Sequence, residues 1–295
     1  MANLTVLPKI EKLSSLVTRI LGCNPGSFRL QGTNSYLVGS GSRRILIDTS
    51  DPGQDEYTAN LNKVLQKYGA QLQEIVITHW HEDHVGAVQD ICSNILHDGI
   101  KVSKIERKST PDRDIGPLAK YNFINKDQVF QTDGATLRVL LTPGHTEDHM
   151  SLYLEEENAV FAGDTVLGEG SCAFEDLYDY MKSLDLIKSV KPSRIYPGHG
   201  PLITDAVSKL TEYIEHRKMR EKQIIDTLHL NKDKWHNTME LLKLIYTDIP
   251  ETLYLAAGHN MLQSIEKLIK EGRIEYQGSC DEPMEMKFKL KLSSL

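Results

Sequence analysis

Apolar runs of strand length alternate with polar loops along the first 204 residues of the chain. Five of these runs lie at residues 44–49, 74–78, 137–141, 158–162 and 193–196. Helical spacing of apolar residues predicts a helix over about 54–68 and another over about 83–92. Each of the five runs ends at a histidine or an aspartate, and three of these residues stand beside glycine, which lets the backbone turn sharply. We therefore predict an α/β fold in which strand ends carry the polar residues.

The pattern changes after Gly200, where helical spacing dominates. Apolar residues at helical steps predict one long helix over 205–228 and shorter helices over 238–246 and 252–271. Two strand-like runs at 272–276 and 286–290 then predict a hairpin, so the segment has the order of a winged helix. We predict two domains, a catalytic domain over residues 1–204 and a helical linker with a winged-helix-like domain over 205–295.

The loop after the run at 74–78 has the spacing H-x-H-x-D-H. His79 and His81 are two residues apart, so an extended backbone projects them to the same side, and Asp83 and His84 follow where the helix begins. A lone histidine is usually structural, but no structural need explains this spacing. Imidazole and carboxylate are ligands that Zn²⁺ prefers. Four such ligands are too many for one tetrahedral ion that keeps a water, so we predict two adjacent metal ions.

Other predicted strands end at further donor residues, namely Asp48, His145, Asp164 and His199. Ligands from the C-terminal ends of several strands converge in α/β folds, so we expect these residues around the loop at 79–84. Residues 27–38 are predicted to form a pair of strands, with Phe28 in the first, around a polar turn over 31–34 that contains Asn34. Such a turn is usually only a turn. Asn34 bears on the chemistry only if the fold points it at the metals.

Composition and charge limit the classes of protein to which this chain can belong. The 295 residues have a formal net charge of -7, which argues against broad adhesion to nucleic acid, although two zinc ions would cancel about four charges at the site. The four cysteines are far apart, without a C-x-x-C pair, so we expect a reducing compartment and no disulfide framework. No apolar run approaches a membrane span. The first 21 residues are slightly basic but too little enriched in Arg and Ser to indicate an import signal.

The motifs together resemble the metallo-β-lactamase superfamily: H-x-H-x-D-H is followed by Gly-His, Gly-Asp and Pro-Gly-His-Gly. More specific motifs, at residues 22–26, 31–34, 142–149, 175–181 and 200–201, are similar to the β-lactamase-like protein 2 group. The resemblance covers nearly the whole chain. It implies an αβ/βα sandwich of two mixed sheets with outer helices and a C-terminal winged helix. It also implies a single-strand-selective endoribonuclease of animal mitochondria.

The resemblance also assigns roles to residues of this chain. One zinc ion is held by His79, His81 and His145, the second by Asp83, His84 and His199, and Asp164 bridges the two. Asp48 supports the histidine loop through hydrogen bonds without being a ligand. Beside these roles, we expect Asp83 to take up a proton when the bridging water is consumed, and Asn34 and Tyr180 to contact the substrate. We expect His149 to form a structural hydrogen bond and not to bind metal.

Two zinc ions about 3.5–4 Å apart can share a water and lower its pKa toward about 7. Attack on RNA would then leave 3′-hydroxyl and 5′-phosphate ends without using the ribose 2′-OH. The metal site alone cannot choose between a phosphodiester and a thioester, so a glyoxalase II-like thioester hydrolase remains an alternative. A non-enzymatic zinc-binding module is a third possibility, although ligands that leave open positions for water argue against it.

Other partners and the location follow from the same resemblance. Single-stranded RNA is the expected substrate, no membrane and no obligate protein partner are expected, and the oligomeric state is open. The mitochondrial matrix is implied, with the cytosol as the alternative. The interval between Asp164 and His199 is too short for the inserted domain of the superfamily's RNA-processing and DNA-repair nucleases. We expect the winged-helix-like region to be a supporting wall of the substrate groove, and the basic cluster at 216–222 is either a solvated helix face or a phosphate contact.

Overall fold

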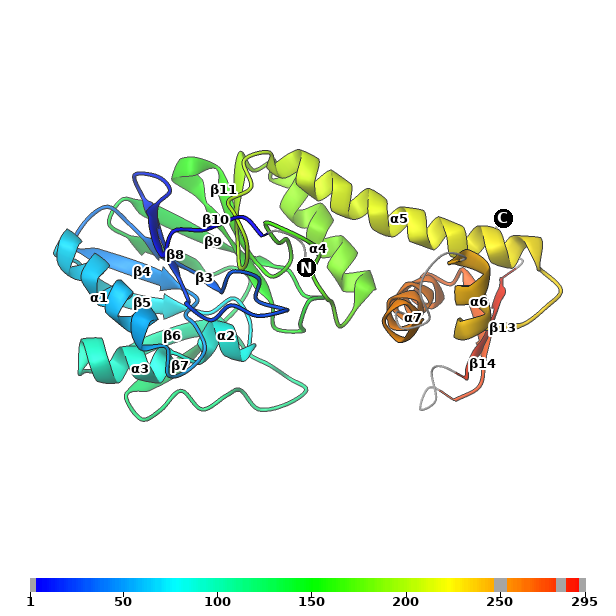
Figure 1. Ribbon diagram of the computed structural model, residues 1–295, viewed down its shortest axis with the longest axis horizontal. Coiled ribbons are helices and arrows are strands. Elements are labelled where there is room, and N and C mark those ends of the chain that lie inside the picture. Colours follow the sequence, from blue (N-terminus) through cyan, green and yellow to red (C-terminus); the bar gives the residue numbers. More distant parts are fainter. Residues whose placement is uncertain (1–3, 247–253, 280–284, 292–295) are drawn as a thin grey trace.

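A computed structural model describes residues 4–246, 254–279 and 285–291, and its N-terminal part is built on two packed sheets (Figure 1). The first sheet has seven strands in the order β1-β2-β3-β4-β5-β6-β7. They are β1 (Ile10–Lys12), β2 (Val17–Leu21), β3 (Asn34–Val38), β4 (Arg43–Ile47), β5 (Gln71–Val76), β6 (Ile100–Ile105) and β7 (Ala119–Ile124). Strands β1 to β4 pair antiparallel and β4 to β7 pair parallel, so the sheet is mixed.

The second sheet has five strands in the order β12-β11-β10-β9-β8. They are β8 (Val129–Thr132), β9 (Ala135–Leu141), β10 (Met150–Leu154), β11 (Ala159–Gly163) and β12 (Arg194–Pro197). Strands β11 and β12 are parallel and the other pairs are antiparallel. The predicted sandwich of two mixed sheets is therefore confirmed.

Three apolar layers hold the sandwich together. Between the sheets, the ring of Tyr36 packs against Phe161 at 5.2 Å between centroids, and Tyr196 lies beside both. Helices α1 (Asp55–Tyr68) and α3 (Val88–Ile91) cover the first sheet, where Leu61 and Leu65 lie one helical turn apart on the buried face of α1. Helix α4 (Leu177–Ser189) covers the second sheet. Burial of these faces supplies the main driving force for the fold.

The helix expected over 83–92 is interrupted in the structure. It consists of α2 (Glu82–Val85), α3, and a π-helical turn η1 (Cys92–Leu96). The break lies at Gly86, where a Cβ would come within 2.6 Å of the Glu82 carbonyl oxygen and of Pro52. The next backbone N–H, that of Ala87, donates to Ser50 instead of continuing the helix. The expected strand pair around residues 27–38 is also wrong in part, because only β3 forms there and residues 27–32 are a loop with one isolated bridge.

The C-terminal region consists of α5 (Ala206–Leu230), α6 (Thr238–Ile245), α7 (Tyr254–Lys270) and a small sheet. Its strands, in the order β13-β15-β14, are β13 (His236–Asn237), β15 (Lys287–Leu290) and β14 (Ile274–Gln277). Helices followed by an antiparallel hairpin confirm the predicted winged-helix arrangement. The expected helix start at residue 252, and Cys280, lie outside the described residues.

Helix α5 connects the two parts of the molecule, running from the sandwich to the C-terminal helices (Figure 1). Its first half packs Leu210 and Ile214 into the core beneath α4, and its second half packs Ile224 and Leu228 into the C-terminal core. Because one helix serves both cores, the boundary at residues 204 and 205 stays a prediction. A short 3₁₀ turn, η2 (Glu155–Glu157), completes the elements. Within the described ranges, no helix has both the length and the hydrophobicity needed to cross a membrane.

Candidate metal centre

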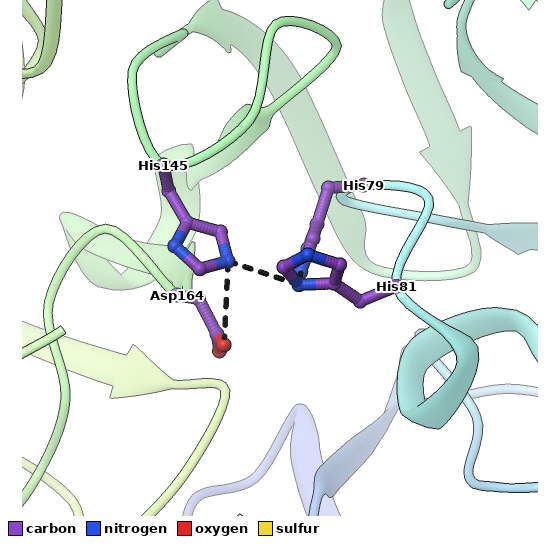
Figure 2. A group of neighbouring side chains, drawn as sticks. All are labelled: His79, His81, His145 and Asp164. Atoms are coloured by element: carbon purple, nitrogen blue, oxygen red, sulfur yellow. Dashed lines mark hydrogen bonds and ion pairs between the residues drawn. The ribbon is translucent and has the colours of Figure 1, made fainter. Parts of the chain in front are cut away.

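Three histidines from two loops meet at one end of the sandwich (Figure 2). His79 and His81 follow β5, and His145 follows β9. His81 Nδ1 lies 2.9 Å from His79 Nε2 and 3.1 Å from His145 Nε2. Zinc–nitrogen bonds of about 2.0–2.1 Å in a tetrahedral site place neighbouring ligand atoms roughly 3.3 Å apart. The three ring nitrogens thus have the spacing of ligands to one ion.

A second group of donors lies next to the first and consists of Asp83, His84 and His199. Asp83 Oδ2 lies 3.4 Å from His84 Nε2 and 3.3 Å from His199 Nε2. Asp164, directly after β11, lies between the groups: its Oδ1 is 3.5 Å from His84 Nε2, and its Oδ2 is 3.4 Å from His199 Nε2 and 3.7 Å from His145 Nε2. One carboxylate therefore faces both three-donor groups, an arrangement that suits two metal ions.

Unpaired buried atoms show that this site fits a metal. His84 Nε2 and Asp164 Oδ1 are buried and have no hydrogen-bond partner within the described residues. An unpaired polar atom in the interior is costly, so such atoms need a ligand that completes them. The loop after β12 approaches the carboxylate closely: a Cβ on Gly198 would come 2.3 Å from Asp164 Oδ1, and only glycine leaves that space.

In four of the histidines, the ring nitrogen that points away from the other donors contacts a hydrogen-bond acceptor. The pairs are His79 Nδ1 with Thr78 Oγ1 (3.0 Å), His84 Nδ1 with Asp48 Oδ2 (2.9 Å), His145 Nδ1 with the Ala173 carbonyl (2.7 Å) and His199 Nδ1 with the Gly32 carbonyl (3.3 Å). When each Nδ1–H donates to its acceptor, Nε2 keeps a lone pair for a metal. The surrounding chain thus fixes the tautomer that coordination requires.

Asp48 is the organising residue of these contacts. Its Oδ1 accepts the backbone N–H of Thr78 at 2.8 Å, and its Oδ2 accepts Thr78 Oγ1–H at 2.8 Å and His84 Nδ1–H at 2.9 Å. Asp48 has a φ of 56°, a left-handed conformation that costs a non-glycine residue about 1–2 kcal/mol. The three hydrogen bonds hold it in that conformation. Asp48 therefore lies where the sequence analysis expects it, behind the histidine loop.

The two donor groups differ in charge. Burial, aided by the neighbouring imidazoles, lowers the pKa of His79 well below its ordinary value, so this ring is neutral. Burial also opposes a charge on His84, but the carboxylates of Asp83 and Asp164 outweigh it and raise the pKa of His84 well above its ordinary value. The same competition raises the pKa of His199 to about 9. Metal binds neutral imidazole, so a metal ion at the second group would replace a ring proton, and the carboxylates of that group supply the negative charge that attracts the ion.

His149 lies beside the centre without belonging to either donor group. Its Nε2 accepts the backbone N–H of Asp164 at 3.1 Å, and its Nδ1 contacts Thr142 Oγ1 at 2.9 Å. The ring is buried, and burial lowers its pKa well below the ordinary value, so it is neutral. The expectation of a hydrogen-bonding role is confirmed, because His149 holds the backbone that carries Asp164.

Asn34 and Tyr180 do not lie where a substrate can touch them, because both side chains are fully buried. Asn34 Nδ2 donates to the carbonyls of Pro197 and Gly200, at 2.9 and 2.8 Å, which fixes the loop that carries His199. The Tyr180 hydroxyl donates to the Thr165 carbonyl at 2.7 Å, next to Asp164. The expected substrate contacts are corrected accordingly: in this structure both residues position loops of the metal centre.

A cavity of about 620 Å³ opens over the donors. Its walls include Phe28, whose side chain is 88% exposed, and Trp80, whose ring lies under the guanidinium of Arg107 at 3.8 Å and near that of Arg113 at 5.4 Å. Neither aromatic residue was predicted to line a site, because the sequence pattern places Phe28 in a strand and Trp80 in the spacing between ligands. An aromatic residue in the glycine-containing segment 26–32 was the available signal.

Two family profiles and several known proteins match this chain. The profile described as Metallo-beta-lactamase superfamily matches residues 29–199, and the Beta-lactamase associated winged helix domain matches residues 238–282. The Beta-lactamase-like protein 2 homolog of Caenorhabditis elegans is 46% identical over 276 residues, 93% of this chain and 91% of that protein. The homolog of Drosophila melanogaster is 44% identical over 282 residues, 95% of this chain and 96% of that protein.

One further relative is named for a different activity, and one solved structure shares the fold. The Thioesterase pkgB of Emericella nidulans is 45% identical over 231 residues, 78% of this chain and 64% of that protein. A beta-lactamase domain protein from Burkholderia ambifaria has a crystal structure with a TM-score of 0.77 and 14% identity, covering 98% of this chain and 96% of its own. At that identity the structural likeness concerns the fold alone.

Proposed function

Because the chain belongs to the metallo-beta-lactamase superfamily and is a hydrolase of that fold, we propose that it is a zinc-dependent endoribonuclease acting on single-stranded RNA. The observation that carries the proposal is the Asp164 carboxylate between two three-donor groups, at the floor of an open cavity. Two bound zinc ions would supply a shared hydroxide near neutral pH and neutralise charge on the attacked phosphate.

The chain's own residues do the positioning. In this proposal one zinc ion is held by His79, His81 and His145, the second by Asp83, His84 and His199, with Asp164 between them. Asp48 fixes the ring of His84 and the backbone at Thr78. Asp83 also accepts the Thr33 hydroxyl at 2.9 Å, so its carboxylate is oriented by the chain as well as by its histidine neighbours. We assign to Asp83 the uptake of the proton released when water is consumed.

The rim of the cavity supports a nucleic-acid substrate. An exposed aromatic ring, Phe28, offers a surface on which an unpaired base stacks, and Trp80 with Arg107 and Arg113 offers an aromatic and cationic surface. Stacking of this kind needs bases that are free of a partner strand, which favours single-stranded over duplex RNA. The similarity to the two protein 2 homologs, over more than nine-tenths of the chain, supports the same conclusion. Residence in the mitochondrial matrix belongs to this proposal, and cell fractionation tests it.

Thioester hydrolysis is the second candidate. It is favoured by the 45% identity to the protein named Thioesterase pkgB. The same cavity would then place a thioester carbonyl over the donors, with the acyl or thiol portion against Phe28. No donor residue distinguishes the two reactions, because metal-bound hydroxide attacks a carbonyl as well as a phosphate.

One paired assay tests the proposal. Zinc-loaded protein is expected to cut an unstructured, end-labelled RNA internally, leaving 5′-phosphate and 3′-hydroxyl ends, and to cut duplex RNA and DNA much less. A chelator should stop the reaction and added zinc should restore it. Rapid hydrolysis of S-lactoylglutathione with intact RNA would reject the ribonuclease and support the thioesterase.

A further inference from the structure

A second hollow of about 300 Å³ adjoins the metal cavity. Its walls come from α5, α6 and α7, and Ser171 lines both this hollow and the metal cavity. We call it the Arg217–Arg220 groove. The lining side chains that the argument uses are His216, Arg217, Arg220, Tyr246 and Asn260. The groove thus begins at the wall of the metal cavity and continues between the sandwich and the C-terminal region.

Among the described residues, the charge that lines this groove is positive and has no carboxylate partner. The Arg217 guanidinium lies 4.7 Å over the Phe174 ring, and that of Arg220 lies 4.7 Å over the Tyr246 ring. Arg220 Nη1 also donates to the neutral Gln223 side chain at 2.9 Å. In the part of the chain that the structure describes, neither guanidinium has a carboxylate partner, and no acidic residue lines the groove. Burial lowers the pKa of His216, so the two arginines carry the charge.

The neighbouring surfaces have a different character. A hollow beside the His145 loop has five acidic residues in its lining, Glu106, Glu147, Glu175, Asp176 and Asp179, with Lys108 as its lysine. On the opposite side of α5, Lys222 pairs with Asp226, and Lys267 pairs with Glu221. A polyanion that leaves the metal cavity across Ser171 therefore meets two arginines that have no carboxylate partner among the described residues.

We propose that the Arg217–Arg220 groove binds phosphates of a single-stranded nucleic acid that extends from the metal cavity across Ser171. This inference rests on the proposed function and defines its substrate as a polymer several nucleotides long. Planar guanidinium groups bind phosphate through paired N–H donors and keep their charge at any physiological pH. Their aromatic neighbours hold both groups in place, and the Tyr246 ring adds a surface for a base.

Helix α5 offers a matched control for the test. Arg217 and Arg220 line this groove, whereas Lys218 and Lys222, one and two positions further along the same helix, line a hollow on its other side. The variants R217Q/R220Q and K218Q/K222Q remove the same formal charge from the same helix. Each full-length, zinc-loaded protein is assayed on a twelve-nucleotide oligouridylate and on bis(p-nitrophenyl) phosphate, which is too small to reach beyond the metal cavity.

For R217Q/R220Q we expect kcat/KM on the oligonucleotide to fall about tenfold or more, while hydrolysis of the small phosphodiester stays within about twofold. Each lost phosphate contact should also reduce the salt dependence, so the slope of log kcat/KM against log salt should become shallower by about 1.4 for two contacts on a single strand. K218Q/K222Q should keep the wild-type slope. The single variant R220Q, expected to change the slope by about half as much, guards against a folding defect in the double variant.

Three results overturn the inference while leaving the proposed function intact. The first is an unchanged oligonucleotide rate and slope in R217Q/R220Q. The second is an equal change in K218Q/K222Q, which would indicate an effect of overall charge instead of a groove. An equal loss on both substrates in R217Q/R220Q would assign the arginines a structural role and also reject the groove. Failure of wild-type protein to cut the oligonucleotide, with S-lactoylglutathione hydrolysed, instead rejects the ribonuclease itself.

Discussion

Both ends of this molecule bury charged side chains, but they do so with opposite results. At the ends of the sandwich strands, His84 Nε2 and Asp164 Oδ1 are buried without a hydrogen-bond partner among the described residues, although they lie 3.5 Å apart. In the C-terminal region, buried Lys267 donates to buried Glu221 at 2.8 Å, so the two charges offset one another. Several donors that gather at one point without hydrogen bonds to one another mark a ligand site, whereas an oppositely charged pair that is hydrogen-bonded within the fold marks architecture.

The largest expected effect is the loss of the carboxylate that faces both donor groups. Asp164→Ala should reduce hydrolysis by about 10³-fold or more, because the missing interactions are worth several kcal/mol of charge stabilisation. Zinc content should fall from two ions per chain, and circular dichroism should show the secondary structure retained. Asp179→Ala, an exposed carboxylate on α4, serves as the control. Metal analysis that finds two zinc ions in the inactive Asp164→Ala protein would contradict the bridging assignment.

The second-largest expected effect is on the free energy of unfolding, with hydrolysis by the folded protein unchanged. Lys267→Met leaves the Glu221 carboxylate buried without its ammonium partner and should lower the free energy of unfolding by about 3 kcal/mol. Adding Glu221→Leu should recover much of that loss, since neither charge is then buried. Urea unfolding followed by circular dichroism measures both variants. If Lys267→Met alone costs nothing, or if the folded double variant loses hydrolysis, the contrast between the two regions fails.

The Lys267–Glu221 pair also predicts how the stability changes with pH. Burial opposes the charge on Lys267, but its hydrogen bonds to Glu221 and Glu271 outweigh burial and raise its pKa. A raised folded-state pKa contributes stability that is fully present below the ordinary lysine value and is lost as the pH rises through the folded value. The stability difference between wild type and Lys267→Met should therefore be constant at neutral pH and shrink only in strongly alkaline buffer.

Asp48→Asn should have an intermediate effect on the metal centre. The amide keeps the shape of the side chain but removes the charge, and its NH₂, which is only a donor, cannot accept from Thr78 or from His84 as Oδ2 does. Loss of such a partner typically costs 10–100-fold in metal affinity or activity. Competition with a chromogenic chelator measures the zinc affinity. Asp51→Asn, on the same loop but hydrogen-bonded to Asn24 and Arg29, is the control and should bind zinc like the wild type.

Most donors of the metal centre could be predicted from the sequence, because they follow from residue spacing and from their position at strand ends. The spacing over 79–84 is readable without a fold, and strand ends of an α/β sandwich predict the convergence of residues as distant as Asp48 and His199. The roles that could not be predicted depend on contacts between residues that are distant in the sequence. The amide of Asn34 bonds carbonyls at Pro197 and Gly200, and no local pattern reveals that partner.

The break of the helix over 83–92 has the same origin. The pattern of apolar residues there is helical, but Gly86 is pressed against Pro52, which belongs to another loop. Exposure is equally hard to read: Leu30 and Phe28 look alike in sequence, yet Phe28 stands 88% exposed at the cavity. Sequence patterns report which residues suit a core or a metal, and only the fold decides which of them face a substrate.

The smallest expected effect tests that exposed ring. Phe28→Ala removes a side chain that is 88% exposed, so the free energy of unfolding should change by no more than about 0.5 kcal/mol. Loss of one stacked base is worth about 1 kcal/mol or somewhat more, so kcat/KM on single-stranded RNA should fall about fivefold or more. Phe28→Trp should retain the wild-type rate because it keeps a stacking surface. Phe123→Ala, an exposed ring on β7 that does not line the cavity, should leave the rate unchanged. Equal rates for Phe28→Ala and wild type would show that this ring does not bind the substrate, and would shift substrate recognition to the arginines of α5.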